Sequence, residues 1–246
     1  MRNFSSIAKK INARIGKAIY DYQLIEKGDR ILVAVSGGKD SLTLLNFLKA
    51  IQGWAPVPFE LVAAHIETDF HCGSYAPKDV LKKMFSSFKI KGVFKRIKAL
   101  DDEKKTSCFW CSWNRRRALF EIAKDQCCNK VALGHHKDDI AETTLMNLLC
   151  NGEISSMNPR QEMFAGEIVL IRPLCYVEER MIKKYAQESG FPKQLSTCSY
   201  GKDSKRELMK QLIGDLEKKI PGTNIKTNIF KSLSRIKEDY IDFKSS

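Results

Sequence analysis

The chain contains a short polar loop whose residue types suit the binding of a polyphosphate. The loop, SGGKDS at residues 36–41, follows the apolar, β-branched run 30–35 and opens a leucine-rich segment. Glycine has no Cβ, so backbone N–H groups can approach an anion closely, and the N-terminus of a following helix favours phosphate. The lysine adds a point charge, whereas the aspartate would repel bare phosphate and therefore indicates bound Mg²⁺. The loop predicts a site for a magnesium-bound nucleotide.

The spacing of this loop excludes two common nucleotide-binding motifs. The chain has neither GxxxxGK[ST] nor the GxGxxG of dinucleotide-binding folds at this position. The alternative interpretation is a tight strand-to-helix turn with incidental polar residues. The order strand, loop, helix favours phosphate binding, because ligands of open parallel sheets bind beyond the carboxyl ends of the strands.

A second polar segment, GHHKDD, begins at Gly134 after another short apolar run. Gly134 would let the backbone approach a ligand. Asp138 and Asp139 are expected at a helix N-terminus, where carboxylates are favourable and can hold a metal ion or polarise a substrate. One of the two could serve only as the helix N-cap, and the sequence does not say which. His135 and His136 have no zinc ligands at suitable spacing nearby, so we expect neutral, hydrogen-bonding histidines.

Eight cysteines are too few for a disulfide scaffold in a chain of 246 residues. Cys108 and Cys111 form a CxxC pair at the start of a helix, which is typical of half a metal site, a redox pair or an ordinary helix start. Cys198 is the best candidate for a third ligand, because it lies in a Ser/Thr-rich loop rather than on an apolar face. The other five are interpreted as core or incidental residues: Cys72, Cys127, Cys128, Cys150 and Cys175.

Three thiolates without an obvious fourth ligand do not suit structural zinc, which has four protein ligands. A [4Fe–4S] cluster held by three cysteines leaves one iron open to an exogenous ligand. Such a site can hold a sulfur species and present it as a nucleophile. Cys108, Cys111 and Cys198 supply the number of thiolates that such a cluster needs. A persulfide or disulfide relay without a cluster is the alternative.

Arginines and tryptophans accompany the CxxC pair. Arg115, Arg116 and Arg117 are consecutive, so on a helix they point in different directions. One or two are expected to face a cleft and bind an RNA phosphate or leaving pyrophosphate, and a solvated face is the alternative. Trp110 and Trp113 could stack on a flipped base, since chemistry on a base requires taking it out of its stack. Packing around a cluster is the favoured interpretation of these tryptophans.

The chain is strongly basic, with 42 Lys and Arg against 29 Asp and Glu and a net charge of +13. This balance suits a polyanionic partner such as RNA, although a solvated basic surface is the alternative. The longest apolar runs are too short to span a bilayer, and the N-terminal residues show no signal sequence. We expect a cytoplasmic protein with no membrane partner.

Apolar runs and helical stripes alternate along the chain, which predicts an α/β fold. Five strands are expected, at residues 30–35, 59–66, 92–98, 130–133 and 167–173. Helices are expected around them, at residues 5–25, 41–51, 75–88, 114–126, 138–149, 178–189, 204–219 and 225–242. This order predicts an open parallel five-stranded sheet with helices on both faces and a helical C-terminal appendage. The expected divisions are an N-terminal helix at 1–27, a nucleotide-binding catalytic domain at 28–195 and a basic helical region at 196–246.

These motifs resemble the PP-loop (N-type ATP pyrophosphatase) family, with its Rossmann-like fold, and are most similar to the tRNA-cytidine 2-sulfurtransferases. The resemblance covers residues 28–200 and includes SGGKDS, CxxC with its arginines, GHHKDD, the IRPL segment 171–174 and the cysteine after Phe191-Pro192. Members cleave ATP between the α and β phosphates, adenylate a carbonyl oxygen and let a nucleophile displace AMP. This chain departs from its relatives by lacking a second cysteine pair near Cys198 and by its C-terminal tail.

The resemblance implies roles for individual residues. The implied ATP-binding residues are Ser36, Gly37, Gly38, Lys39, Asp40, Ser41, Gly134, His135 and Asp139. The implied catalytic residues are Cys108, Cys111, Cys198, Asp40 and Asp138. Asp40 would also hold Mg²⁺, the three cysteines would hold the [4Fe–4S] cluster, and the arginine run would bind RNA.

The expected function is ATP-dependent 2-thiolation of a tRNA base, with cytidine as the expected target. The implied partners are tRNA and a sulfur donor, either a cysteine desulfurase or sulfide, and a homodimer is one open arrangement. A cluster-dependent enzyme that desulfurates small thio-bases is an alternative activity. A catalytically silent RNA-binding module is the alternative from outside the enzymes, but the intact SGGKDS loop argues against it.

Overall fold

The computed structural model of the chain describes residues 5–69, 76–98, 107–192, 205–237 and 239. The chain divides into two compact units. The first comprises Met1–His136 with Asn158–Lys202, and the second comprises Lys137–Met157 with Asp203–Ser246. The divisions expected after residues 27 and 195 remain predictions.

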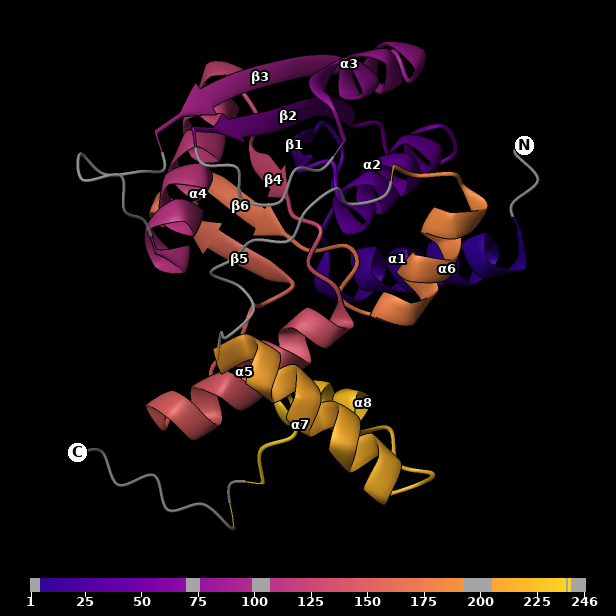
Figure 1. The fold of residues 1–246 in the computed structure, drawn as a ribbon. Helices are drawn as coiled ribbons and strands as arrows, with labels where there is room; N and C mark the ends of the chain where they lie inside the picture. The colour runs from indigo at the N-terminus through magenta and orange to yellow at the C-terminus, as the bar shows by residue number, and fades with distance from the viewer. Residues whose placement is uncertain (1–4, 70–75, 99–106, 193–204, 238, 240–246) are drawn as a thin grey trace. The chain divides into compact units, whose positions relative to one another are not determined.

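The first unit is built on a six-stranded sheet in the order β3-β2-β1-β4-β6-β5 (Figure 1). Its strands are β1 Arg30–Ala34, β2 Glu60–Thr68, β3 Lys91–Ile97, β4 Lys130–Ala132, β5 Arg160–Met163 and β6 Ile168–Ile171. All neighbouring pairs are parallel except β5 and β6, which are antiparallel. The predicted α/β fold with an open parallel sheet is confirmed, but the predicted number of five strands is wrong.

The additional strand, β5, carries no periodic apolar signal. Its sequence is Arg-Gln-Glu-Met, and it lies at the edge of the sheet beside β6. An edge strand keeps one side toward solvent and needs few apolar side chains. Prediction from apolar runs in the sequence therefore does not detect β5.

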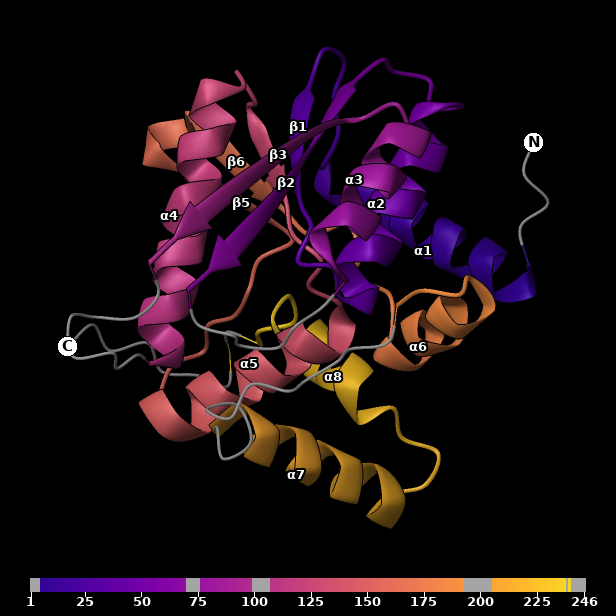
Figure 2. The same cartoon turned by 45° about the horizontal axis from the view of Figure 1, so that its top comes forward.

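Helices cover both faces of the sheet. Those of the first unit are α1 Ser6–Tyr22, α2 Lys39–Gln52, α3 Lys78–Ser87, α4 Cys108–Asp125 and α6 Glu179–Glu188, with a short 3₁₀ turn at Phe164–Gly166. Figure 2 shows α4 on one side of the strands and α2 and α3 on the other. Apolar side chains fill the core between α4 and the sheet. Alternate residues of each strand point toward α4 and pack against the apolar side of the helix. The core members from these elements are Leu32, Val62, Val131, Leu170, Leu119 and Ile122.

Two helix ends differ from the predictions by more than five residues, and local hydrogen bonds accompany each of them. α4 begins at Cys108 rather than at residue 114, because the Ser107 side chain accepts a hydrogen bond of 3.1 Å from the Trp110 backbone N–H and caps the helix. α8, in the second unit, ends at Ser232 rather than at residue 242. There the Ser232 hydroxyl donates to the Ile229 carbonyl at 2.7 Å, which satisfies a terminal carbonyl group.

The second unit consists of α5 Lys137–Asn151, α7 Lys205–Lys219 and α8 Ile225–Ser232. α5 packs against both C-terminal helices. Side-chain hydrogen bonds hold the segment that follows α5, where the Asn147 amide donates to Ser155 and the Thr144 hydroxyl donates to Ser156. Across the described parts of the chain, no helix is long and apolar enough to cross a membrane.

Candidate active site

The topology brings the two polar segments to the same edge of the sheet. β1 and β4 are neighbouring parallel strands, and the chain proceeds from β1 toward β2 and β3 but from β4 toward β6. The SGGKDS loop follows β1, and the first residues of GHHKDD follow β4. The crevice at such a change of direction is where open α/β sheets bind ligands. The strand order therefore places both loops where a nucleotide site is expected.

Gly134 touches the start of α2. A Cβ built on Gly134 would lie 3.1 Å from the backbone nitrogen of Ser41 and 3.2 Å from the carbonyl carbon of Asp40. These atoms are backbone and cannot rotate away. A Cβ at this position would force the start of α2 to move by a few tenths of an ångström, so glycine lets the two loops meet without that shift.

The SGGKDS loop is held by its own serines. Gly37 has a φ of 87°, in the left-handed region that favours glycine. The Ser41 hydroxyl donates to the Gly38 carbonyl at 2.9 Å, and the Ser36 hydroxyl oxygen accepts from the Gly38 N–H at 3.3 Å. Gly38 is the N-cap of α2 and has no side chain to occupy the N–H groups of the first turn. These donors suit an anionic group at the helix start.

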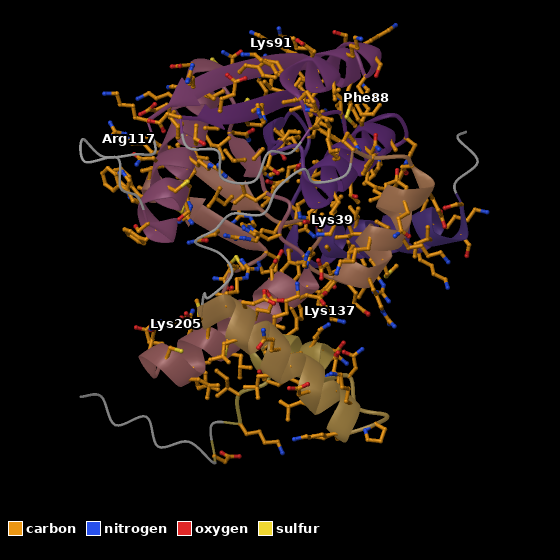
Figure 3. All side chains as sticks on the ribbon, in the orientation of Figure 1. Lys39, Phe88, Lys91, Arg117, Lys137 and Lys205 are labelled. Atoms are coloured by element: carbon orange, nitrogen blue, oxygen red, sulfur yellow. The ribbon has the colours of Figure 1, made fainter. Side chains whose placement is uncertain are left out.

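Lys39, which is labelled in Figure 3, lies between the carboxylates of Asp40 and Glu179. Its Nζ is 3.0 Å from Asp40 Oδ2 and 3.1 Å from Glu179 Oε1. Burial acts to lower the pKa of Lys39, but the two carboxylates outweigh it, so the pKa is raised and the ammonium stays charged. Glu179 also pairs with Lys183 at 3.0 Å. Sequence reasoning missed Glu179, because it lies 140 positions from the loop on the otherwise ordinary helix α6.

The Oδ1 atom of Asp40, which is not the oxygen bonded to Lys39, is available to bind a cation. Asp40 Oδ1 is buried and accepts no hydrogen bond from the residues that the structure describes. His136 Nε2 lies 3.7 Å from it, beyond hydrogen-bond distance. An uncompensated carboxylate oxygen beside a phosphate-binding loop suits a hard cation such as Mg²⁺. Asp40 therefore fits the magnesium role that its position in the loop predicts.

His65, on β2, contacts the backbone immediately before the SGGKDS loop. Its Nδ1 lies 2.7 Å from the carbonyl oxygen of Val35, the residue that precedes the loop. Burial lowers the pKa of His65, and nearby Arg115 and Lys78 lower it further against the opposing effects of Val35 and Glu67. The ring is therefore neutral and can donate Nδ1–H to the carbonyl. Sequence reasoning missed His65, because nothing in a strand sequence says which side chain will meet a neighbouring loop.

The two aspartates of GHHKDD pair with basic residues of the C-terminal helices within the second unit. Asp138 is buried and lies 2.8 Å from Lys226, and Asp139 is bonded to Arg206. Arg206 also contacts Glu142 at 2.9 Å. Sequence reasoning missed both cations, because only their charge distinguishes them in a basic tail. The ATP-binding role of Asp139 and the catalytic role of Asp138 remain predictions.

Two of the three predicted cluster ligands begin α4. Cys111 is a buried free thiol, and Cys108 is the first residue of the same helix, three positions earlier. Cys198 lies outside the described residues. Within the described ranges, no three His, Cys, Asp or Glu side chains form a metal-binding group. A CxxC pair in the first helical turn is compatible with two cluster ligands, and the assignment of all three cysteines remains a prediction.

The other described cysteines do not resemble ligands. Cys175 is buried, and this burial raises the pKa of its thiol to about 12. Burial likewise raises the pKa of Cys128. A thiol with a raised pKa gives little thiolate, which is the form that binds metals and reacts. Cys127 and Cys150 are exposed free thiols, and Cys72 lies outside the described residues.

The three consecutive arginines point in different directions. Arg115 is half-buried on the same side of α4 as Cys111, and its Nε has no hydrogen-bond partner among the described residues. Arg116 is exposed. Arg117 is also exposed and pairs with Glu121 at 3.0 Å. Arg115 is therefore the arginine of this run placed toward the interior of the first unit.

A cavity lies beside the loop within the first unit. Its volume is about 590 Å³, and its lining residues come from the loop, from α6 and from the turn after α6: Gly38, Lys39, Lys183, Ala186, Gln187, Gly190, Phe191 and Pro192. Two lysines give it positive charge next to the loop, and the turn gives it an apolar wall. The cavity provides space for an anionic group that approaches Lys39.

The family of the chain follows from these motifs and their arrangement. Residues 7–204 match the model of the PP-loop domain family. The chain therefore belongs to the PP-loop family, and the resemblance stated from its motifs is confirmed.

Curated relatives indicate the branch. The chain is 36% identical to the tRNA-cytidine(32) 2-sulfurtransferase of Vibrio cholerae, and the match covers 99% of this chain and 81% of that protein. It is 35% identical to the protein of the same name from Nitrosospira multiformis, over 97% and 81% of the two chains. A third match, in Neisseria meningitidis, has 36% identity over 89% of this chain and 70% of that protein.

A solved structure agrees with the fold. The U34-tRNA thiolase NcsA from Methanococcus maripaludis, determined with its [4Fe-4S] cluster, has a TM-score of 0.73 to this chain. The match covers 94% of this chain and 80% of that chain at 22% sequence identity. At this identity the likeness establishes the architecture of the chain.

Proposed function

We propose that this chain is an ATP-dependent tRNA sulfurtransferase that replaces the C2 carbonyl oxygen of a cytidine with sulfur. The observation that carries the proposal is the contact of Gly134 with Ser41, which joins the two family motifs into one crevice. The curated relatives with the name tRNA-cytidine(32) 2-sulfurtransferase support the reaction and the base. A cytoplasmic location is part of the proposal.

The first step is adenylation of the base. The carbonyl oxygen attacks the α-phosphorus of ATP, a new oxygen–phosphorus bond forms, and the bond to the β-phosphate breaks to release pyrophosphate. Lys39 and the N–H groups at the start of α2 would stabilise the negative charge on the phosphates. Asp40 would hold Mg²⁺ through its buried Oδ1. The fixed positions of these donors lower the barrier, because they need no reorganisation during the reaction.

The second step is displacement of AMP by sulfur. Cys108, Cys111 and Cys198 would hold a [4Fe–4S] cluster, which supplies an iron position for a sulfur species. Cys111 keeps its thiol on the inward side of α4, away from bulk solvent. Arg115, on that same side, has an Nε without a partner among the described residues and would balance negative charge there. A persulfide relay between the same cysteines is the alternative sulfur chemistry.

Purified protein and a tRNA that lacks thiolation test this proposal. The protein is reconstituted anaerobically with iron and sulfide, then incubated with the tRNA, ATP, Mg²⁺ and sulfide, and the nucleosides are identified by mass spectrometry. We expect 2-thiocytidine and equimolar pyrophosphate, and we expect Lys39→Met to form neither at a measurable rate. Fully loaded protein that forms no thiolated nucleoside with ATP would refute the proposal.

Two further outcomes of this assay separate the alternatives. Full activity in a colourless, iron-free preparation supplied with a cysteine desulfurase and cysteine, but not with sulfide alone, would favour the persulfide relay, because a cluster gives a brown protein and a persulfide needs a donor of sulfane sulfur. ATP-independent loss of sulfur from a small thio-base, with no tRNA product, would favour the desulfidase.

A further inference from the structure

The solvent side of α4 carries an aromatic surface that the proposed chemistry does not use. The side chains of Phe109, Trp110 and Trp113 are 76%, 43% and 41% exposed. Trp110 and Trp113 stack with ring centroids 5.6 Å apart and an interplanar angle of 13°. Large aromatic side chains gathered on a surface commonly mark an interaction site.

A cation extends this stack. The guanidinium of Arg117 lies 5.7 Å from the centroid of the Trp113 ring. Arg117 is on the outer side of α4 in Figure 3. Trp110, Trp113 and Arg117 follow one another at helical spacings of three and four, and Phe109 lies four positions before Trp113. We call these four residues the α4 platform. Cys111 lies within the same two turns but faces inward.

Among the described residues, the charge around the platform is positive. Arg116 is exposed beside Arg117, and Lys95 of the neighbouring strand β3 approaches the same helix. Glu121, the acidic residue in contact with the platform, is shared by Lys95 at 2.7 Å and Arg117 at 3.0 Å. The hydrogen bond from Lys95 lowers the pKa of Glu121 more than burial raises it, so this carboxylate is ionised and offset by two cations. Aromatic faces flanked by surplus cations match the surface of a single-stranded nucleic acid.

We propose that the α4 platform stacks against unpaired bases of the RNA loop that contains the target base. The inference rests on the proposed function, because it takes tRNA as the substrate. Every base has an aromatic face, and the nearly parallel tryptophans offer a stack that a further base can extend. Arg117 and Arg116 would meet the phosphates on either side. The platform begins beside the CxxC pair, so it would hold the loop near the end of α4 that carries the cysteines.

Tryptophan variants on the reconstituted full-length protein test the platform. Trp113→Ala and Trp110→Ala are compared with Trp54→Ala, because Trp54 is a 56% exposed tryptophan that follows α2 and does not belong to the platform. Binding of a fluorescent RNA stem-loop is measured by anisotropy at several salt concentrations. We expect affinity to fall about tenfold or more for each platform variant and to stay unchanged for Trp54→Ala. Trp113→Phe should recover most of the loss, since it keeps an aromatic face.

A second readout separates stacking from charge. The platform tryptophans should lower affinity without changing the salt slope, whereas Arg117→Gln should reduce that slope by about one unit. The KM for ATP should be unchanged in all variants, because none of these residues lies at the SGGKDS loop. RNA affinity equal to wild type in both tryptophan variants overturns the inference.

The assay also distinguishes failure of the inference from failure of the proposed function. If the wild-type protein thiolates tRNA and the platform variants bind and thiolate it equally well, the proposed function stands and the proposed role of the platform is refuted. If the wild-type protein forms no thiolated nucleoside, the proposed function itself is refuted. Variants that bind RNA normally but no longer accept sulfur from a cysteine desulfurase would assign the surface to a protein partner and also overturn the inference.

Discussion

Gly134 and Ser41 are in backbone contact across the two loops that end β4 and β1. The space for a Cβ on Gly134 is limited by Ser41 N at 3.1 Å and by the Asp40 carbonyl carbon at 3.2 Å. Both neighbours belong to the first turn of α2, whose N–H groups and Lys39 make up the proposed phosphate site. A methyl group at position 134 would therefore crowd the start of α2.

Replacing Gly134 with alanine should damage the site more than the fold. The methyl group would push the start of α2 by a few tenths of an ångström, and misplacement of catalytic groups is costly, so we expect kcat/KM for ATP to fall about 10- to 100-fold. Overpacking should lower the free energy of unfolding by about 1–3 kcal/mol. Gly214→Ala is the control, because Gly214 has no atom within 4 Å of a built Cβ. Wild-type kinetics in Gly134→Ala would contradict this account of the crevice.

At the proposed phosphate site, Glu179 would compete with phosphate for Lys39. Because it holds the ammonium at 3.1 Å, we expect Glu179→Gln to strengthen inhibition by pyrophosphate about two- to fivefold, the range of a partly exposed ion pair. Glu188→Gln, at the exposed end of the same helix, should leave inhibition unchanged. Inhibition constants from steady-state kinetics test both variants. Weaker inhibition in Glu179→Gln would mean that this carboxylate assists phosphate binding through Lys39.

The neutral His65 should make stability fall on acidification. Its folded-state pKa is lowered below the ordinary value of 6.5, chiefly by burial, so below that pH the unfolded chain binds more protons than the folded chain. The contribution of His65 is therefore fully present above pH 6.5 and is lost as the pH falls toward the folded-state value. Thermal unfolding of wild type and His65→Gln between pH 7.5 and pH 5, expressed as free energies, measures the difference. Equal pH dependence in the two proteins would exclude His65 as its source.

Arg206 stabilises the packing of α7 on α5. It neutralises Asp139 and the nearly buried Glu142, and burial already raises the pKa of Glu142 despite that contact. Arg206→Ala should lower the free energy of unfolding by about 1–3 kcal/mol, after allowance for the partial exposure of the guanidinium. Lys205→Ala, one residue away and exposed, is the control. Adding Glu142→Gln to Arg206→Ala should recover part of the loss, and a double variant less stable than the single one would argue against charge pairing.

Cys111 should be required for the binding of iron, whereas a cysteine remote from α4 should not be required. Cys111→Ser should lose most of the iron and visible absorbance of the reconstituted protein, because two remaining thiolates hold a cluster poorly. Cys150→Ser should retain both, since Cys150 is an exposed free thiol on α5. Iron and sulfide assays on anaerobic preparations measure the difference. Full iron in Cys111→Ser would remove this residue from the predicted ligand set.

The sequence predicts much of this fold because its signals are local. The run 30–35 and the polar loop after it specify a strand, a turn and a helix through side-chain pattern alone. β5 has no such pattern, because edge strands tolerate polar residues. Glu179 and His65 reach the loop only through tertiary packing, so no spacing along the chain reveals them. The stacking of Trp110 on Trp113 likewise depends on where α4 begins.

The central claim is that this chain thiolates cytidine in tRNA at the expense of ATP. The most direct measurement is mass spectrometry of tRNA nucleosides from cells that lack the protein, complemented with wild type or with Lys39→Met. The account predicts that 2-thiocytidine disappears, returns with wild type and does not return with the variant. Unchanged 2-thiocytidine in the cells that lack the protein would contradict it.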